Sequence, residues 1–594
     1  MSEDSHQSGG WRLTVRLILI GTSVFALYAN SLSVLAPTYN RMVHWGLLAT
    51  VVFLIYRRDS SAQYNPRMTD LALAAFTLAT SVFVIVDWSY YIERTGLVTN
   101  WELVSGVLMV LLLLEATRRT IGRFLPLLVV IFLLYAIFGR WAPGIFLHKG
   151  YGLSRLVGTL YLGNGGIYGL PMEISATYVI MFVMFGMLLM RSGGDRWFID
   201  LSYTLTGRLR GGPALSAILS SGIMGMLTGS PVANVVTTGN FTIPLMKRSG
   251  FAPQMAGAIS AVASTAGMFT PPLMGAGAFL IAEFLNIAYV EVAKAAVIPA
   301  ALFFLSLMAV VYFTAWREDL RVQAGESVPK LGQTLIRYGH MSPPLVFLVF
   351  LIFSGRSLML SAFWAMGLTV GLSLLRSHTR ISLSKLISAL EEAAFKTIPI
   401  ATACASAGII VGIINLTGLG FTLSGALTGL AEGQPVLLLG VAMAACLCLG
   451  MAVPPTAVYI IMAGLTVPAM VAAGFNPLAC HFFIFFCSSI GAITPPVALA
   501  AYAASAIAGS DVNKTGFTAF RLGIAGYLIP FLVIYWNGLM MVGGWGEILT
   551  ALIVGIVTIL AAAFGLELLG HLRRRLLARS GSGEKLEPTK PQEP

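Results

Sequence analysis

Four short stretches of glycine, proline and hydroxyl residues interrupt apolar runs of this sequence. They are Gly229-Ser230-Pro231, Thr270-Pro271-Pro272, Pro454-Pro455-Thr456 and Thr494-Pro495-Pro496. A proline inside a helix removes one backbone hydrogen bond at a cost of about 3 kcal/mol, and hydrocarbon offers no water to replace it. Each stretch therefore predicts a helix break whose freed groups face something polar. Carbonyl and hydroxyl oxygens suit a hard cation such as Na⁺, and helix N-termini suit an anionic group.

The composition identifies the elements that carry these breaks. The chain has 594 residues, of which 57% are hydrophobic and 10% are charged, whereas a soluble protein has about 25% charged residues. This composition is that of a polytopic membrane protein. The net charge of +12 does not indicate nucleic-acid binding, because the basic residues lie in short loops between apolar runs and no basic-aromatic motif accompanies them.

Apolar runs near the length that a membrane helix needs divide the sequence into spans. Basic clusters such as Arg57-Arg58 and Arg118-Arg119 follow alternate spans, so the positive-inside rule predicts that both termini are cytoplasmic. Segment 141–173 is then external and too rich in glycine for a clean span, and the tail at 571–594 is predicted to be disordered. The predicted spans lie at about 12–35, 42–56, 69–89, 101–117, 124–140, 174–191, 254–285, 295–316, 341–356, 360–376, 396–416, 434–470, 478–508, 517–537 and 548–568.

Segment 212–246 predicts a different kind of element. Its two apolar halves flank Gly229-Ser230-Pro231, and each half, at about 16 residues, is short for a full crossing. We interpret the segment as a re-entrant helical hairpin whose tip lies near the middle of the membrane. Two ordinary short spans are the alternative.

The same unit occurs twice. Thr270-Pro271-Pro272 and Thr494-Pro495-Pro496 lie 224 positions apart (494 minus 270), and an ungapped shift of that length aligns further residues. The sequence thus predicts a broken hairpin followed by a broken helix, in two copies. The additional matches are Pro231 with Pro455, Ala233 with Ala457, Thr242 with Thr466, Pro244 with Pro468, Met246 with Met470, Gly250 with Gly474, Phe251 with Phe475, Pro253 with Pro477, Ser264 with Ser488 and Gly267 with Gly491.

Charges orient the two copies in opposite directions. The first hairpin opens onto Lys247-Arg248, which places its base in the cytoplasm, while the matching Val471-Ala472 is uncharged. An odd number of predicted crossings separates the hairpins, so the second base faces outside. Inverted repeats with interrupted helices are typical of secondary transporters with a site near the midplane. The predicted fold class is an all-α polytopic inverted-repeat transporter with two re-entrant hairpins and two discontinuous helices.

Other chemistry finds little support in the residues. The sequence holds no nucleophile–base set, no phosphate-binding loop and no evident pair of acids, which argues against an enzyme. The five cysteines lie in apolar runs without the further residues of a zinc site. His481 is interpreted as a core or interface residue rather than a proton carrier. An intramembrane enzyme or a channel is the alternative from another functional class.

Three motifs resemble one transporter family. They read LLLLEATRR, GSPVANVVTTGNFTIPLMKRSGFAPQMAGAISAVASTAG and ITPPVALAAYAASAIAGSDVNKTGFTAFRLG. They resemble the fused permease of tripartite ATP-independent periplasmic (TRAP) transporters, in the branch that works with TAXI-type binding proteins. The resemblance implies that residues 1–123 correspond to a fused small membrane subunit and 124–570 to the large transport subunit. The inverted repeats of that subunit would lie at about 212–300 and 434–537.

The resemblance also implies a function and a location. It suggests Na⁺-coupled uptake of an organic anion, either a dicarboxylate or an amino-acid-like molecule, across the bacterial inner membrane. A periplasmic substrate-binding protein would deliver the anion, and the hairpin domain would move in an elevator-type step. The permease would be a monomer surrounded by membrane lipids. A stand-alone ion-coupled anion transporter without a binding protein is the alternative, and coupling to H⁺ instead of Na⁺ stays open.

Site residues carry over from the resemblance. The first tip keeps the pattern Gly-Ser-x-x-Ala-Asn at 229–234, whereas the second, at 450–456, departs from Gly-Met-Gly-x-Pro-Thr-Thr at Ala452 and Pro455. Pro455 removes a hydroxyl and an N–H, so the second ion site is expected to differ in geometry or to depend on Thr456. The predicted ion ligands are Gly229, Ser230, Asn234, Gly267, Thr270, Pro271, Thr456, Gly491, Thr494 and Pro495. The predicted substrate contacts are Ser230, Asn234, Thr456 and Arg521.

Arg521 has two interpretations. It could pair with a substrate carboxylate, because a charge inside the membrane is costly and often functional. Its side chain could equally extend to the cytoplasmic interface.

Overall fold

Helices carry the fold. The computed structural model describes residues 8–33, 35–57, 66–94, 97–320, 329–430 and 434–579. Within these ranges ten helices are long and apolar enough to cross a membrane, which confirms the predicted multi-pass fold. Most of the shorter apolar helices are hairpin arms or halves of broken helices.

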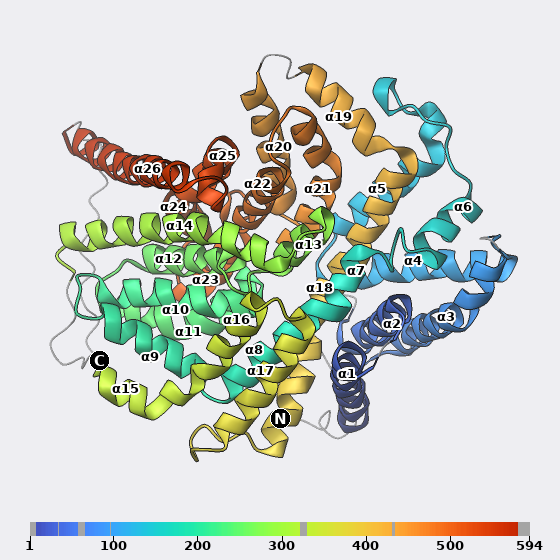
Figure 1. The fold of residues 1–594 in the computed structure, drawn as a ribbon, viewed down its shortest axis with the longest axis horizontal. Coiled ribbons are helices and arrows are strands. Elements are labelled where there is room, and N and C mark those ends of the chain that lie inside the picture. Colours follow the sequence, from blue (N-terminus) through green and yellow to red (C-terminus); the bar gives the residue numbers. More distant parts are fainter. Residues whose placement is uncertain are drawn as a thin grey trace.

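A long central helix joins the two parts of the molecule. Figure 1 shows the N-terminal helices on one side and the C-terminal helix α26 (Trp545–Arg579) on the other. Helix α18 (Leu383–Thr417) has 35 residues and is about 50 Å long. It packs against three of the four N-terminal helices and also against helix α21 (Pro455–Ala472) of the second repeat. The N-terminal helices are α1 (Ser8–Ser31), α2 (Pro37–Ile55), α3 (Met68–Glu93) and α4 (Asn100–Thr120).

Buried charges fasten α2, α3 and α4 to one another. The Arg119 guanidinium on α4 lies 2.8 Å from the Asp70 carboxylate on α3 and 2.8 Å from Glu115 one turn away. It also donates to the carbonyl oxygen of Tyr56, just after α2. The side chains of Arg119 and Asp70 are only 3% and 5% exposed. Removing one partner of such a pair would leave the other charge buried, at a cost of about 3–5 kcal/mol.

The segment between α5 (Phe124–Phe138) and α8 (Ile180–Arg191) is irregular, as its glycines predict. It contains short helical pieces, of which α6 (Leu153–Val157) and α7 (Leu170–Ile174) are two. Helix α9 (Gly194–Thr206) then leads into the first hairpin.

Both predicted repeats are present. The first consists of α10 (Gly212–Thr228), α11 (Pro231–Arg248), α12 (Pro253–Ala266) and α13 (Ala276–Leu285). The second consists of α20 (Pro435–Gly450), α21, α22 (Pro477–Ile490) and α23 (Leu499–Ala508). Helices α11 and α12 begin and end 224 positions before α21 and α22, which is the shift read from the sequence. The tips differ, because two residues join α10 to α11 and four join α20 to α21.

Contacts between the repeats show that they run in opposite directions. The Lys247 ammonium at the base of the first hairpin donates to the carbonyl oxygen of Ala508, the last residue of α23, at 2.8 Å. Phe284 near the end of α13 stacks on His481 near the start of α22, with ring centroids 5.8 Å apart. The base of each repeat therefore lies beside the end of the other repeat's broken helix, as inverted repeats require.

Some predicted elements differ in detail. The span predicted at 341–356 is the 11-residue helix α16 (Pro343–Phe353), bent by 57° against the helical segment that α15 (Leu331–Tyr338) begins. Helix α26 continues to Arg579, so the first part of the tail predicted to be disordered is helical, and residues 580–594 lie outside the described residues.

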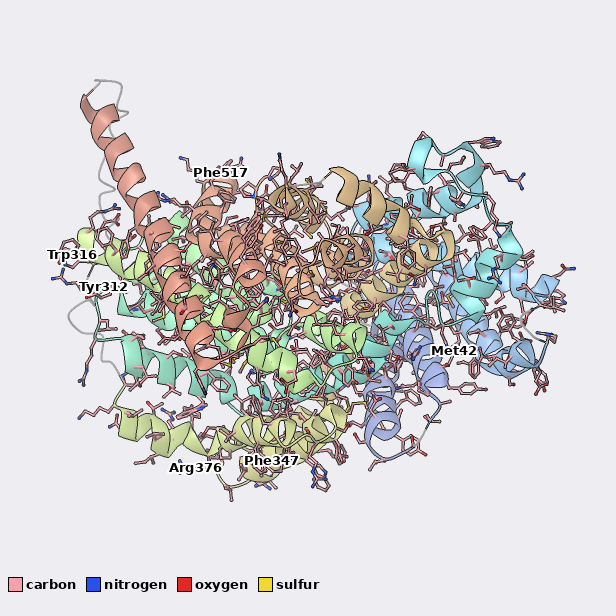
Figure 2. The ribbon with its side chains drawn as sticks, turned by 45° about the horizontal axis from the view of Figure 1, so that its top comes forward. Met42, Tyr312, Trp316, Phe347, Arg376 and Phe517 are labelled. Carbon is pink, nitrogen blue, oxygen red and sulfur yellow. The ribbon has the colours of Figure 1, made fainter. Side chains whose placement is uncertain are left out.

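In Figure 2, Met42 on α2 and Tyr312 on α14 lie on opposite sides of the molecule. The other helices are α14 (Tyr289–Arg317), α17 (Leu358–Ser373), α19 (Leu419–Leu430), α24 (Val512–Leu522) and α25 (Ile524–Tyr535).

Opposite orientation predicts opposite chemical accessibility at matched positions. Arg248 and Ala472 are exposed and end the second arms of the two hairpins. In spheroplasts, with the exposed Cys448 replaced by serine, A472C should react with a membrane-impermeant maleimide from outside. R248C should react only after the membrane is opened. Labelling of both variants from the same side would contradict the inversion.

Candidate ion-binding site

The first hairpin tip is a two-residue turn between helix ends. Gly229 closes α10 at φ 62°, a left-handed conformation that side chains disfavour, and its N–H donates to the carbonyl oxygen of Gly225. Ser230 caps α11, because its hydroxyl oxygen accepts from the N–H of Ala233 at 3.4 Å. Pro231 occupies the first helical position. The tip thus presents the partially positive end of α11.

Asn234 lies one turn into α11 and is fully buried. Its amide nitrogen donates to the carbonyl oxygen of Ser221 at 2.7 Å, which fixes the side chain across the hairpin. Its Oδ1 has no hydrogen-bond partner among the described residues, and neither have the hydroxyl oxygens of Ser260 and Ser264 on α12. A buried polar group without a partner costs about 1–3 kcal/mol. These oxygens therefore indicate a place for a ligand.

The first helix break exposes carbonyl groups between α12 and α13. The 3₁₀ turn Gly267–Phe269 ends α12, and Thr270 continues in an extended conformation. Tyr289, at the start of α14, donates to the carbonyl oxygens of Pro272 at 2.8 Å and Leu273 at 2.5 Å. One tyrosine hydroxyl therefore contacts two carbonyl oxygens of the non-helical segment between α12 and α13.

The second break repeats this form with different partners. Gly491–Ile493 makes the 3₁₀ turn, and the Thr494 hydroxyl lies 2.8 Å from the hydroxyl of Tyr527 on α25. The carbonyl oxygen of Pro496 accepts from the hydroxyl of Tyr502 on α23. The two breaks therefore share their backbone form and differ in the tyrosines that satisfy them.

Paired glycines bring each tip against its break. A Cβ on Gly267 would lie 2.4 Å from the Cα of Gly225, and a Cβ on Gly491 would lie 2.8 Å from the Cα of Gly450. Carbon atoms do not approach this closely, so a side chain at either position would push the hairpin away. Each break lies between the two apolar halves of its helix. The glycine contacts therefore hold each hairpin tip beside the middle of a broken helix.

The two breaks also meet each other. Phe269 of the first break stacks on Phe486 of α22 with ring centroids 4.3 Å apart, and the 3₁₀ turn of each break contacts the first half of the other broken helix. The structure thus gathers both tips and both breaks in one region, although the role of their residues as ion ligands stays a prediction. The predicted ligands in this region are Gly229, Ser230, Asn234, Gly267, Thr270, Pro271, Thr456, Gly491, Thr494 and Pro495.

The second tip differs chemically from the first. Val458 stands at the position that matches Asn234 and offers no oxygen. Ser488, which matches Ser264, donates to the carbonyl oxygen three residues before it at 2.9 Å. Thr456, 7% exposed, is the second residue of α21. The first repeat therefore offers more buried side-chain oxygens for a cation than the second.

Arg521 stands apart from the tips and breaks. It lines a pocket of about 210 Å³ together with Gln254 at the start of α12 and Arg317 at the end of α14. The tip contact lies at the opposite end of α12, whose 14 residues span about 20 Å. The structure does not bring Arg521 together with the other three predicted substrate contacts, and its contact with a substrate stays a prediction.

Neutral oxygens dominate the region of the tips and breaks. Among the described residues, no group of three His, Cys, Asp or Glu side chains that could hold a metal ion is found. His481 is engaged elsewhere, with its Nδ1 lying 2.8 Å from the Tyr459 hydroxyl. Amide, hydroxyl and backbone carbonyl oxygens beside helix ends fit an alkali cation. The unpartnered Oδ1 of Asn234 is the atom that this fit explains most directly.

Sequence reasoning missed the tyrosines. Tyr289 and Tyr502 bond to carbonyl groups of the two breaks from positions that do not match in the repeat, so the alignment does not reveal them. Tyr527 matches Phe303, which packs edge-on against Phe269 at the first break. This replacement of phenyl by phenol at matched positions is the one signal that the sequence held.

The sequence model of one family covers most of the chain. It describes the DctM component of the tripartite ATP-independent periplasmic transporter and matches residues 108–548, a range that holds both hairpins and both breaks. This chain belongs to that family. Its members are transporter permeases, not enzymes. Helices α1, α2 and α3 of the permease precede the matched range.

Individual relatives are distant. The permease is 24% identical over 376 residues to the C4-dicarboxylate TRAP transporter large permease protein DctM of Pseudomonas aeruginosa, covering 61% of the permease and 86% of that relative. It is 24% identical over 429 residues to the isethionate TRAP transporter permease protein DctMQ of Oleidesulfovibrio alaskensis, covering 68% of the permease and 64% of that relative. Among solved structures, the Alcanivorax borkumensis YdaH transporter is 15% identical, with a TM-score of 0.43, and covers 74% of the permease and 98% of that chain. That likeness is too weak to bear on the site.

Removal of the Tyr289 hydroxyl tests its role at the first break. Y289F leaves the carbonyl oxygens of Pro272 and Leu273 buried without their donor, a loss of about 1–3 kcal/mol. The thermal unfolding midpoint of the purified permease should therefore fall by a few degrees. Y312F on the same helix, where the side chain is 43% exposed, should leave it unchanged. An unaltered midpoint in Y289F would contradict this account of the break.

Proposed function

We propose that the permease takes up an organic anion by coupling its entry to Na⁺. The observation that carries the proposal is the buried Oδ1 of Asn234, which has no partner among the described residues and lies at the tip that meets the first break. Asn234, the hydroxyl of Ser264 and carbonyl groups of the break would hold the ion. Bound Na⁺ would supply positive charge to the site, and the N-terminus of α11 at Ser230 adds its own partial charge for the anionic group.

The substrate class follows from relatives and from this charge. C4-dicarboxylate, 2,3-diketo-L-gulonate and isethionate stand in the names of three relatives, and all are small organic anions. A dicarboxylate or an amino-acid-like anion fits the same pattern of a cation site beside a helix N-terminus.

We assign delivery of the anion to a periplasmic substrate-binding protein. The family name, which describes a tripartite periplasmic transporter, supports such a partner. The motif ITPPVALAAYAASAIAGSDVNKTGFTAFRLG supports a binding protein of the TAXI type. Residues 1–123 are assigned to a fused small subunit, because most of them precede the matched range. The fused permease would act as a monomer in the bacterial inner membrane with both termini in the cytoplasm.

The contacts between repeats favour movement as one body. Helix α12 packs along α23, and α13 packs on α22, so the two repeats share an extensive interface. Of the N-terminal helices, α1, α2 and α4 pack on α18 instead. We assign an elevator-type step to the repeats, which would carry the site past α18 and the N-terminal helices.

Uptake into proteoliposomes tests the function. The permease is reconstituted with an inward Na⁺ gradient, the cognate binding protein is added outside, and labelled dicarboxylates, sulfonates and amino acids are supplied. Accumulation should require both Na⁺ and the binding protein. Accumulation without the binding protein would indicate a stand-alone transporter, and accumulation driven by a proton gradient alone would contradict Na⁺ coupling.

Two glycine variants control this assay. G267A should abolish accumulation, because its Cβ would lie 2.4 Å from the Cα of Gly225 and separate the tip from the break. G371A on α17, where a Cβ meets no atom within 4 Å, should keep the activity of the parent. Full activity of G267A would contradict the proposed site.

A further inference from the structure

A basic pocket lies where α1, α8 and α18 meet, outside the tips and breaks. Its volume is about 550 Å³, and its walls come from the first turns of α1, the end of α8 and the first half of α18. The pocket opens to the surface at the predicted cytoplasmic ends of these helices. The residues that line it are Arg12, Leu13, Arg16, Leu19, Arg191, Ser388, Glu391, Glu392 and Phe395.

The pocket has more cations than carboxylates. Arg16 pairs with Glu391 at 3.0 Å, and Arg191 pairs with Glu392 at 2.6 Å. Arg12 adds a third guanidinium to the lining. The side chains of Arg16 and Arg191 are 42% and 44% exposed, so each guanidinium faces both its carboxylate and open space. A guanidinium has five donors, of which a single carboxylate uses at most two in a bidentate pair.

The surplus of positive charge is larger still when the next turn of α18 is included. The Lys396 ammonium lies 3.1 Å from the Glu392 carboxylate, one turn further along α18. Glu392 is therefore shared between two cations. An anion that entered the pocket would meet the Arg16 and Arg191 guanidiniums, each of which has more donors than its single carboxylate uses.

An exposed apolar stripe begins at the rim of this pocket. Leu13, Leu17, Val24 and Tyr28 lie at helical spacing along one face of α1 and are 57%, 60%, 50% and 53% exposed. Other parts of α1 pack on α2 and α18. From Leu13, which also lines the pocket, the stripe runs for about 22 Å, more than half the thickness of a bilayer's hydrocarbon core.

We propose that this pocket binds the phosphate headgroup of an anionic phospholipid whose acyl chain lies along the stripe on α1. Arginine recognises phosphate through paired, charge-assisted hydrogen bonds, and basic pockets between membrane helices bind such headgroups. The stripe favours a lipid over a soluble phosphate, because a soluble ion gains nothing from apolar contact. The bound lipid bridges α1 to α8 and α18 and so fastens the N-terminal helices to the rest of the permease.

Lipid-dependent thermal stability of the full-length permease tests this site. The delipidated protein in mild detergent is titrated with phosphatidylglycerol, phosphatidylcholine or inorganic phosphate, and its unfolding midpoint is followed. Phosphatidylglycerol should raise the midpoint in a saturable way, and the other two should not. An equal rise with inorganic phosphate would reassign the pocket to a soluble anion, and an equal rise with phosphatidylcholine would overturn headgroup recognition.

Two double variants distinguish lipid binding in the pocket from a general effect of positive surface charge. R16Q/R191Q removes two pocket arginines and should weaken phosphatidylglycerol binding roughly tenfold or more. R208Q/R248Q removes two exposed arginines that do not line the pocket, and should leave the affinity within about twofold. Equal weakening by both double variants would overturn the proposal.

A second double variant is expected to change lipid affinity in the opposite direction, so the test does not depend on R16Q/R191Q folding correctly. E391Q/E392Q removes the carboxylates that pair with the two arginines and should tighten phosphatidylglycerol binding. Unchanged or weaker binding by folded E391Q/E392Q would contradict the pocket as the headgroup site. Because the readout is lipid affinity, its outcome is independent of whether Na⁺ drives uptake.

Discussion

A backbone carbonyl group in hydrocarbon needs a donor or a cation, and each helix break of this permease leaves carbonyl groups without a helical partner. The structure meets part of this need with side chains, because Tyr289 bonds to Pro272 and Leu273 and Tyr502 bonds to Pro496. The hairpin tips meet the rest of the breaks. A tip that ends at the depth of a break adds a helix N-terminus and polar side chains where the membrane itself has none.

This constraint explains why glycines stand where helices meet. Gly225 with Gly267, and Gly450 with Gly491, let each hairpin approach the backbone of its broken helix. The opposed repeats then place both breaks together, with Phe269 and Phe486 stacked between them. Within this shared arrangement the chemistry is unequal, because the Asn234 Oδ1 in the first repeat has no partner in the described part of the chain and Val458 occupies its position in the second.

Much of this architecture could be predicted from the sequence because prolines and glycines fix backbone form directly. The 224-residue shift reproduces both ends of α11 and α12 in α21 and α22, and Lys247-Arg248 oriented the first hairpin correctly relative to the second. Side-chain partners were not predictable in this way. Tyr289 reaches its carbonyl groups from α14, and no tyrosine stands at the matching position of the second repeat.

The sequence also did not predict where a side chain lies relative to the hairpin tips. Arg521 lies in a family-like motif, yet its pocket is at the far end of α12 from the tip, a separation that only the packing of α24 reveals. The bend before α16 and the additional helix α19 were not predicted for a related reason, since hydropathy measures apolar length and does not register a bend or a helix too short to cross.

Na⁺ binding by two asparagine variants of α11 tests whether Asn234 holds the coupling ion. In N234A the buried amide is lost, whereas N240A removes an exposed amide that donates to the carbonyl oxygen of Val236. Na⁺, but not K⁺, should raise the unfolding midpoint of the parent and of N240A. N234A should need at least about tenfold more Na⁺ for the same rise, because losing one ligand of a buried cation removes about 1.5–3 kcal/mol. An N234A variant that binds Na⁺ as tightly as the parent would contradict this role of Asn234.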